Sequence, residues 1–244
     1  MEVVLETVKR QLESGKFTFD LLIPKLQNQL NSVLNQNQPL LSKMMNYYKL
    51  IDVSNGTPIS DYEILNIIQD KSELIQEGIE VIEFQKFPNV DYTKMYFTPD
   101  EVALLEAQIC IVKNAKFRGA SHPFFLGVIF QCIENFKNEE EIHVSIVHEL
   151  AHQELFLLNM LDRLVLTSNN PRLIHSPLQG KARPAIGRLH SAHALYRMIQ
   201  LRDHLSSQNK QIFSRYLNET VETFSSGDLS EFGEFLVTIY KRVL

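Results

Sequence analysis

The feature that most constrains the fold of this chain is the segment 142–166. It contains neither proline nor glycine and holds the sequence His-Glu-Leu-Ala-His at 148–152. Apolar residues recur in it at helical spacing, and three glutamates at 139–141 suit the positive end of a helix dipole. This pattern predicts a long, largely apolar helix. In a helix His148 and His152 lie one turn apart on one face, where two neutral imidazoles can bind a single metal ion. The alternative is a metal-free pair of hydrogen-bonded histidines.

A catalytic metal site also needs a third protein ligand and open coordination positions. Acidic candidates are few, because no glutamate occurs between Glu154 and Glu219. Asp162 lies about 15 Å along the predicted helix from His152, too far to share its ion. Glu154 faces away from the histidine stripe. A further histidine is therefore the expected third ligand.

Three histidines that follow the predicted helix are candidates for this role. His190 and His193 are three residues apart and share one helical face, and His175 lies in a predicted loop. We expect His190 to be the third ligand, with His193 as the second choice. His193 is otherwise a hydrogen-bonded neighbour of the site or a surface residue, and His175 is a candidate substrate contact.

Two arginines in the same region are candidate anion anchors. Three neutral imidazoles leave a divalent ion with its full positive charge, which suits an anionic co-ligand. Arg183 and Arg188 lie close to His190 in the sequence, and a planar guanidinium matches a carboxylate in two-point contact. Both are therefore candidates to bind a dicarboxylate, and the alternative for each is a surface ion pair.

Composition limits the class of protein. A chain of 244 residues, 44% hydrophobic and 22% charged, is typical of a globular protein, and we expect one domain over residues 1–244. A net charge of −5 without a basic stripe argues against nucleic acid as the main partner. Cys110 and Cys132 lie in apolar runs and are expected to be buried free thiols. Because neither a signal peptide nor a membrane span is recognisable, we expect a cytoplasmic protein without membrane contact. The sequence does not indicate an oligomeric state.

The rest of the chain predicts a mainly α fold with a small β component (α+β). Strands are expected at 78–84 and 124–133, which are rich in β-branched and aromatic residues. Helical periodicity and capping residues predict further helices within 1–50 and at 98–114, 184–204, 208–224 and 230–242. We expect residues 1–120 to form a mostly helical scaffold for substrate recognition. Residues 121–244 would form the metal core, in which the two-histidine helix packs against the helix that carries His190.

Within residues 142–203, about a quarter of the chain, several features occur together. They are the His-Glu-Leu-Ala-His sequence, a Ser176-Pro177 loop, Arg183-Pro184, and Gly187-x-x-His190 followed by small residues. In this combination the chain resembles the H-E-x-x-H-type peptide β-hydroxylases, which use iron(II) and 2-oxoglutarate and occur with ribosomally made, modified peptides.

The resemblance implies a function and a role for each site residue. By it, His148, His152 and His190 would hold iron(II), and Arg183 would bind the far carboxylate of 2-oxoglutarate. Glu149 would orient a ligand or a water molecule. The implied reaction hydroxylates the β-carbon of a side chain in a peptide substrate, and the protein supplies the geometry and a dry pocket.

Two other functions remain open from the sequence. The first is a zinc-dependent peptidase, in which Glu149 acts as general base for a metal-bound water. Its H-x-x-G-x-x-H form is absent, because Leu155 and Leu158 stand at the matching positions. The second is a non-catalytic peptide-binding protein that retains the histidine pair.

Overall fold

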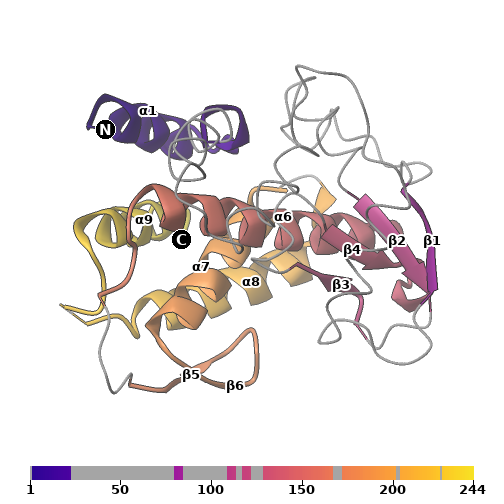
Figure 1. The fold of residues 1–244 in the computed structure, drawn as a ribbon. Helices are drawn as coiled ribbons and strands as arrows, with labels where there is room; N and C mark the ends of the chain where they lie inside the picture. The colour runs from indigo at the N-terminus through magenta and orange to yellow at the C-terminus, as the bar shows by residue number, and fades with distance from the viewer. Residues whose placement is uncertain are drawn as a thin grey trace. The chain divides into compact units, whose positions relative to one another are not determined.

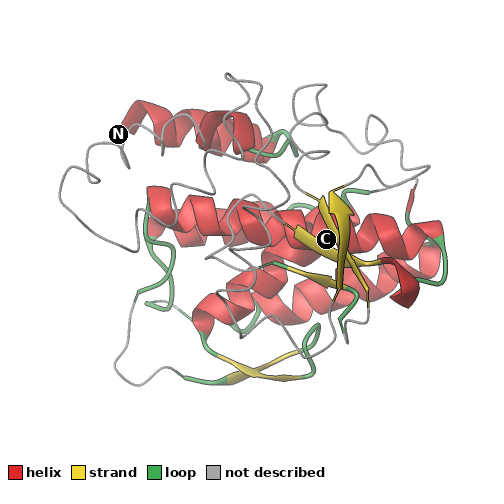
Figure 2. Ribbon diagram, turned by 45° about the vertical axis from the view of Figure 1, so that its right-hand side comes forward, coloured by secondary structure: helices red, strands yellow, loops and turns green. Residues whose placement is uncertain are grey.

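The computed structural model describes residues 2–22, 80–84, 109–113, 117–121, 129–166, 172–201, 204–225 and 227–244. Helices predominate in these ranges and the β component is small (Figures 1 and 2), which confirms the predicted mainly α class. None of the described helices has the length and apolar character needed to cross a membrane.

The chain divides into two compact units. The C-terminal unit combines residues 1–22 with residues 154–244, and the sheet unit consists of residues 23–153. The division therefore falls inside the predicted histidine helix and not near residue 120. The N-terminal segment groups with the C-terminal residues, although about 130 residues separate them in the chain.

The sheet unit contains a four-stranded sheet in the order β1-β2-β4-β3. β1 (Glu80–Phe84) pairs antiparallel with β2 (Ile109–Lys113), which pairs parallel with β4 (Ile129–Cys132). β3 (Gly119–Ala120) lies at the edge, antiparallel to β4. All four side chains of β4 are buried, and the predicted burial of Cys132 is confirmed. β1 and β4 confirm the two predicted strands.

One prediction for this unit is wrong. The sequence predicts the end of a helix at 109–113, whereas the structure forms β2 there. The Ile-Cys-Ile-Val run suits a strand, because β-branched side chains pack well on a pleated surface. Pairing with β1 and β4 on both sides also satisfies the backbone groups of β2. The rest of that predicted helix, at 98–108, and the side chain of Cys110 lie outside the described residues.

α6 (Glu139–Leu161) is the predicted histidine helix. Asn138 caps it, because its side-chain oxygen accepts a hydrogen bond from the Glu141 N–H at 2.9 Å. The helix ends before its predicted limit at residue 166. The Leu166 N–H instead donates to the carbonyl of Asp228 at 3.1 Å, so this stretch pairs with a later loop.

The described part of the C-terminal unit contains the last turns of α6, four longer helices and a hairpin. α7 is its central element, because nearly every residue from Arg188 to the end of that helix is buried. Ser206 and Ser230 cap α8 and α9 through their side chains. α7, α8 and α9 confirm three predicted helices, each with an earlier C-terminal end. The helices are α1 (Glu2–Glu13), α7 (Ala185–Ile199), α8 (Ser207–Val221) and α9 (Glu231–Lys241).

The loop predicted around Ser176-Pro177 is the turn of a hairpin. β5 (Ile174–Ser176) pairs antiparallel with β6 (Lys181–Arg183). Gly180 in the turn has a φ of +63°, a conformation that favours glycine. The Ser176 hydroxyl donates to the Ser191 hydroxyl at 3.1 Å, which ties the hairpin to α7. The helical scaffold predicted within 1–120 lies largely outside the described residues and stays a prediction there.

Candidate metal centre

The two histidines of α6 converge on one point. The Nε2 atoms of His148 and His152 are 3.0 Å apart, and their rings meet edge to face. Burial lowers the pKa of His148 to about 4, because desolvation penalises its charged form. The His148 imidazole is therefore neutral at pH 7, the state that a metal ligand requires.

This separation allows a test of whether the pair fits a metal ion. Two nitrogen ligands that bind one ion at about 2.1 Å and at right angles are about 3 Å apart. The observed 3.0 Å agrees with that value. The same distance also allows a hydrogen bond between two neutral imidazoles. Within the described parts of the chain, no group of three or more His, Cys, Asp or Glu side chains forms a metal-binding cluster.

Glu149 follows the first of these histidines and is buried. The Ser121 hydroxyl donates to its Oε2 at 2.6 Å, and its Oε1 lies 3.9 Å from His148 Nε2. Burial raises the pKa of Glu149 to about 7, and the Ser121 hydrogen bond acts in the opposite direction. A Cβ at Gly119 would lie 3.0 Å from Glu149 Cγ and would clash with the Ser145 hydroxyl. Glycine on β3 therefore leaves the room that the carboxyl side chain occupies.

His190, the expected third ligand, lies on α7 in the C-terminal unit and is half-buried. Its ring packs against the ring of Phe156, from the last turns of α6, with the centroids 4.8 Å apart. His190 is thus held beside the C-terminal part of the histidine helix by an aromatic contact.

His193 and Glu154 belong to a buried hydrogen-bonded cluster. His193 Nε2 lies 2.8 Å from Glu154 Oε2, and its Nδ1 lies 2.8 Å from the Tyr240 hydroxyl. Both ring nitrogens are therefore engaged by protein groups, and the side chain is fully buried rather than at the surface. Arg197 and Thr18 supply the other partners of the Glu154 carboxylate, at 2.7–2.8 Å.

The charge of Glu154 follows from these partners. Burial alone would raise its pKa, but the Arg197 guanidinium and the hydrogen bonds from His193 and Thr18 lower the pKa to about 2. The carboxylate is therefore ionised and fully used within the protein. The sequence gives one signal for this cluster, namely a glutamate and an arginine inside largely apolar helices, where burial requires partners. The pairing itself was not predicted.

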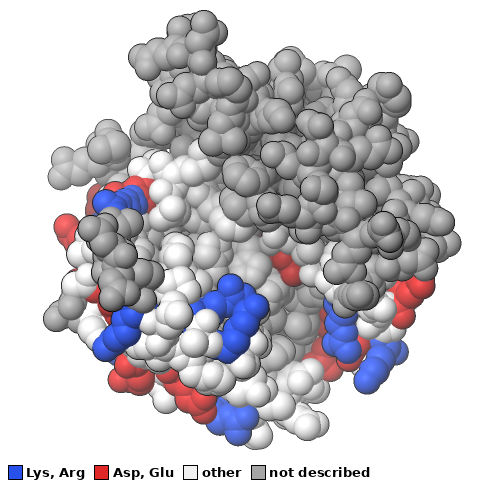
Figure 3. Space-filling view, turned by 60° about the horizontal axis from the view of Figure 1, so that its bottom comes forward, with Lys and Arg blue, Asp and Glu red and all other residues white. Residues whose placement is uncertain are grey.

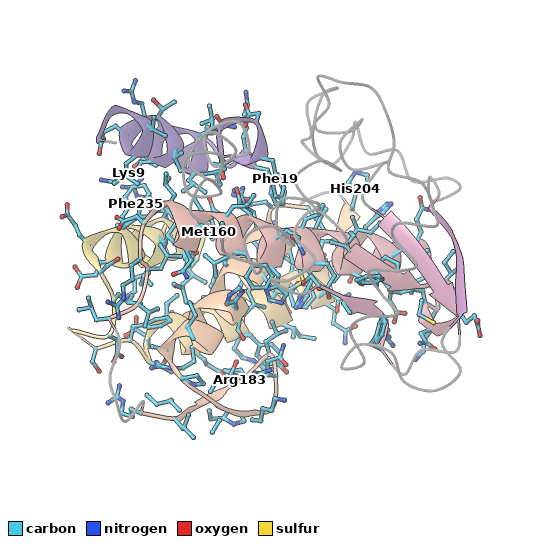
Figure 4. The ribbon with its side chains drawn as sticks, in the orientation of Figure 1. Lys9, Phe19, Met160, Arg183, His204 and Phe235 are labelled. Carbon is cyan, nitrogen blue, oxygen red and sulfur yellow. The ribbon has the colours of Figure 1, made fainter. Side chains whose placement is uncertain are left out.

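Arg183 is the last residue of β6, in the β5–β6 hairpin (Figure 4). Its Nη2 donates to Gln179 Oε1 at 3.2 Å, while its Nε is buried without a hydrogen-bond partner among the described residues. A Cβ at Gly187 would lie 3.3 Å from Arg183 Cβ and 3.4 Å from its Cδ. The Arg183 side chain therefore lies across Gly187. An unpaired Nε next to a weakly held Nη2 is a fork that fits a carboxylate.

The other two candidates have different surroundings. Arg188 is fully buried, donates to the Thr223 carbonyl and hydroxyl at 2.8 and 2.6 Å, and lies 3.5 Å from Asp228. It therefore holds the loop after α8 to α7. His175 is exposed on β5.

On the face shown in Figure 3, the described Lys and Arg side chains are interspersed with Asp and Glu.

Comparison with models of known protein families and with curated proteins gives no match to this chain.

Proposed function

We propose that this protein is an iron(II)- and 2-oxoglutarate-dependent oxygenase that hydroxylates the β-carbon of a side chain in a ribosomally made peptide. His148, His152 and His190 hold the metal, and Arg183 binds the far carboxylate of 2-oxoglutarate. Glu149 orients a ligand or a water molecule. We place the activity in the cytoplasm, with the peptide as partner and without nucleic acid or membrane.

The paired nitrogens of His148 and His152, 3.0 Å apart, are the support for a metal ion. For His190 as the third ligand, the support is its ring contact with a residue of α6. His148, His152 and Phe156 recur every four residues and so lie along one face of the helix. His190 packs on Phe156, the last of the three.

The observation that favours an oxygenase over other metal enzymes is that the buried Nε of Arg183 has no hydrogen-bond partner among the described residues. The Nε of Arg188 shares this feature, but the Nη1 of Arg188 is already bonded to Thr223. A buried guanidinium nitrogen without a partner is costly, and a carboxylate that accepts from Nε and Nη2 removes that cost. The dianion of 2-oxoglutarate would also balance the positive charge left by three neutral imidazoles.

The bound groups and the protein have separate roles in the proposed reaction. Iron(II) and 2-oxoglutarate supply oxidation by molecular oxygen, with one oxygen atom entering the peptide hydroxyl and the other entering succinate as carbon dioxide leaves. The chain's residues bind and orient. Arg183 would bind one carboxylate of the organic acid through its guanidinium.

A zinc hydrolase is the second candidate, and one observation favours it. The pKa of Glu149 is raised to about 7 by burial, which suits a general base that works near neutral pH. In this reading Glu149 accepts a proton from a metal-bound water that attacks a peptide carbonyl. The arginine fork would then have no role in the reaction.

Reconstitution separates the candidates. The protein is loaded anaerobically with iron(II), then given 2-oxoglutarate and oxygen, and succinate is quantified. We expect succinate that depends on iron and on His152. Cleavage of a peptide library by the zinc-loaded protein, without any need for 2-oxoglutarate, would replace the oxygenase with the hydrolase. A chain that binds neither metal would be a peptide-binding protein.

A further inference from the structure

Two oppositely charged side chains form an ion pair in the interior of the C-terminal unit. Arg197 Nε and Nη2 donate to the two oxygens of Glu154 at 2.8 Å, and neither side chain is exposed. Two further bonds come from the same unit, between Glu154 and His193 and between Arg197 and Gln200. Removing both charges from water is costly, and their attraction offsets that cost only when the remaining polar atoms are hydrogen-bonded. The partners of those remaining atoms therefore decide whether the pair is stable.

The N-terminal segment supplies these partners. Arg197 Nη1 donates to the Gly15 carbonyl at 2.7 Å, and its Nη2 donates to the Lys16 carbonyl at 2.9 Å. The Thr18 N–H and hydroxyl donate to Glu154 Oε1 at 2.8 and 2.7 Å. All of these residues belong to the C-terminal unit. Three of these four bonds are made by backbone atoms of the segment, so the ion pair binds it chiefly through its main chain.

The local sequence explains why these backbone groups are available. After α1, Gly15 turns the chain with a φ of +79°, a conformation that favours glycine. Residues 16–18 then have no regular secondary structure, so their backbone groups need partners elsewhere. The ring of Phe17 lies against the Arg197 guanidinium, with 4.3 Å between the ring centroid and Cζ. The side chain of Lys16 is exposed, although its carbonyl is bound.

We propose that Glu154 and Arg197 form a backbone clamp, a site for the main chain of a non-helical peptide segment, which residues 15–18 of the same chain occupy. The clamp holds the N-terminal segment on the C-terminal unit. All five N–H donors of the guanidinium are used, two of them by the segment. Release of the segment therefore leaves polar atoms of a buried ion pair without partners, which is costly. No proposed ligand of the metal or of 2-oxoglutarate belongs to the clamp, so this inference is independent of the proposed function.

Limited trypsin digestion of the whole chain under native conditions measures release of the segment. Trypsin cleaves after Lys16 only when the Lys16 carbonyl leaves Arg197. Mass spectrometry compares the rate of this cleavage with that after Arg215, an exposed residue of α8 that serves as the internal reference. When opening and closing are fast, the cleavage rate follows the population of the open form. A rise in the Lys16-to-Arg215 rate ratio therefore reports local release, whereas general unfolding raises both rates.

The main variant and its control make the same chemical change at two arginines. Arg197→Lys keeps the charge but removes the planar fork that binds several oxygens at once. We expect it to raise the rate ratio about 10- to 150-fold, as is typical when hydrogen bonds of a charged group are lost. Arg242 contacts the same segment through an exposed ion pair with Glu13. Arg242→Lys should change the ratio less than about fivefold.

Two milder variants complete the test. Thr18→Val removes only the hydroxyl bond to Glu154 and should raise the ratio about two- to tenfold. Lys16→Arg keeps the cleavage site and the backbone and should show the wild-type ratio. A wild-type ratio in Arg197→Lys, or in Thr18→Val where the first variant does not fold, would overturn the proposal. An equal rise in Arg242→Lys would also overturn it, and a raised ratio in Lys16→Arg would reject recognition through the main chain.

Discussion

Two arginines five positions apart show how the surroundings of a residue decide its role. Arg183 is half-buried, its Nε has no hydrogen-bond partner among the described residues, and its Nη2 donates to the neutral Gln179. Arg188 is fully buried and is bound to Thr223 and Asp228. From the sequence, both arginines are candidate anion anchors. The Nε of Arg188 also has no hydrogen-bond partner among the described residues, but its Nη1 and Nη2 are engaged, so these contacts support Arg183 rather than Arg188 as the proposed anion anchor.

Arg183→Ala should weaken binding of 2-oxoglutarate to the iron-loaded protein by about 10- to 150-fold, because charge-assisted hydrogen bonds worth about 1.5–3 kcal/mol are lost. Metal affinity should not change. Anaerobic calorimetric titration measures both constants. Lys181→Ala, which removes an exposed charge from the same hairpin, is the matched control and should bind normally. Unchanged 2-oxoglutarate affinity in Arg183→Ala would reject its role.

Arg188→Met should destabilise the protein by about 2–3 kcal/mol, because the half-buried Thr223 hydroxyl loses its donor and the Thr223 carbonyl keeps only the longer bond from Arg172. Arg172 shares the partners Thr223 and Asp228 but is exposed. Arg172→Met should therefore cost less than about 1 kcal/mol. Urea unfolding compares the two variants. Equal losses of unfolding free energy in the two variants would mean that the buried Arg188 stabilises the fold no more than the exposed Arg172 does.

For single residues, the sequence predicts which histidines lie on one helix face, but not which side chains surround them. The spacing of His148 and His152 within one helix is local, so periodicity predicts their convergence. The partners of Glu154 come from Thr18 on one side of the chain and from His193 and Arg197 on the other. Such long-range pairs leave no local pattern, so a buried charged cluster was missed.

Among the elements, α6 was the most predictable and β2 the least. α6 has an acidic first turn and no proline or glycine. These signals are strong because they are local. In β2, a short apolar run fits either helical or extended spacing, and only pairing with β1 and β4 decides between them. The same holds for the short β5–β6 hairpin, which the sequence predicts only as loop.

Gly119→Ala tests the packing of β3 against α6. The added Cβ would clash with the Ser145 hydroxyl and would lie 3.0 Å from Gln131 Nε2 and Glu149 Cγ. We expect a loss of about 1–3 kcal/mol in unfolding free energy, as is typical of overpacking. The displaced Glu149 should also lower turnover more than it lowers metal affinity. Gly180→Ala is the comparison for backbone strain without a clash, because its Cβ meets open space while its φ is +63°; it should lower stability but leave turnover unchanged. Wild-type stability and turnover in Gly119→Ala would contradict this packing.

For the whole molecule, the N-terminal segment is part of the C-terminal unit. The Tyr196 hydroxyl donates to the Leu12 carbonyl at 3.0 Å, and Arg197 donates to the carbonyls of Gly15 and Lys16 at 2.7 and 2.9 Å. Leu12 is fully buried. The sequence predicted α1 but assigned it to a scaffold over 1–120, because side-chain contacts across such a distance in the chain have no local signal.

Native-state hydrogen exchange tests this grouping. The amides of α1 should exchange with the same opening free energy as those of α7, because both belong to one cooperative unit. Tyr196→Phe should lower the protection of α1 by about 1 kcal/mol through loss of one hydrogen bond. Unprotected amides in α1 beside a protected α7 would show that the segment is not docked.

Equilibrium binding of iron(II) to the wild type and to three single alanine variants tests the central claim most directly. We predict one ion per chain, with affinity reduced at least about 100-fold in His152→Ala and in His190→Ala, and unchanged in His175→Ala, which removes an exposed histidine from the hairpin. Absence of a stoichiometric ion in the wild type, or wild-type affinity in His190→Ala, would contradict the three-histidine site.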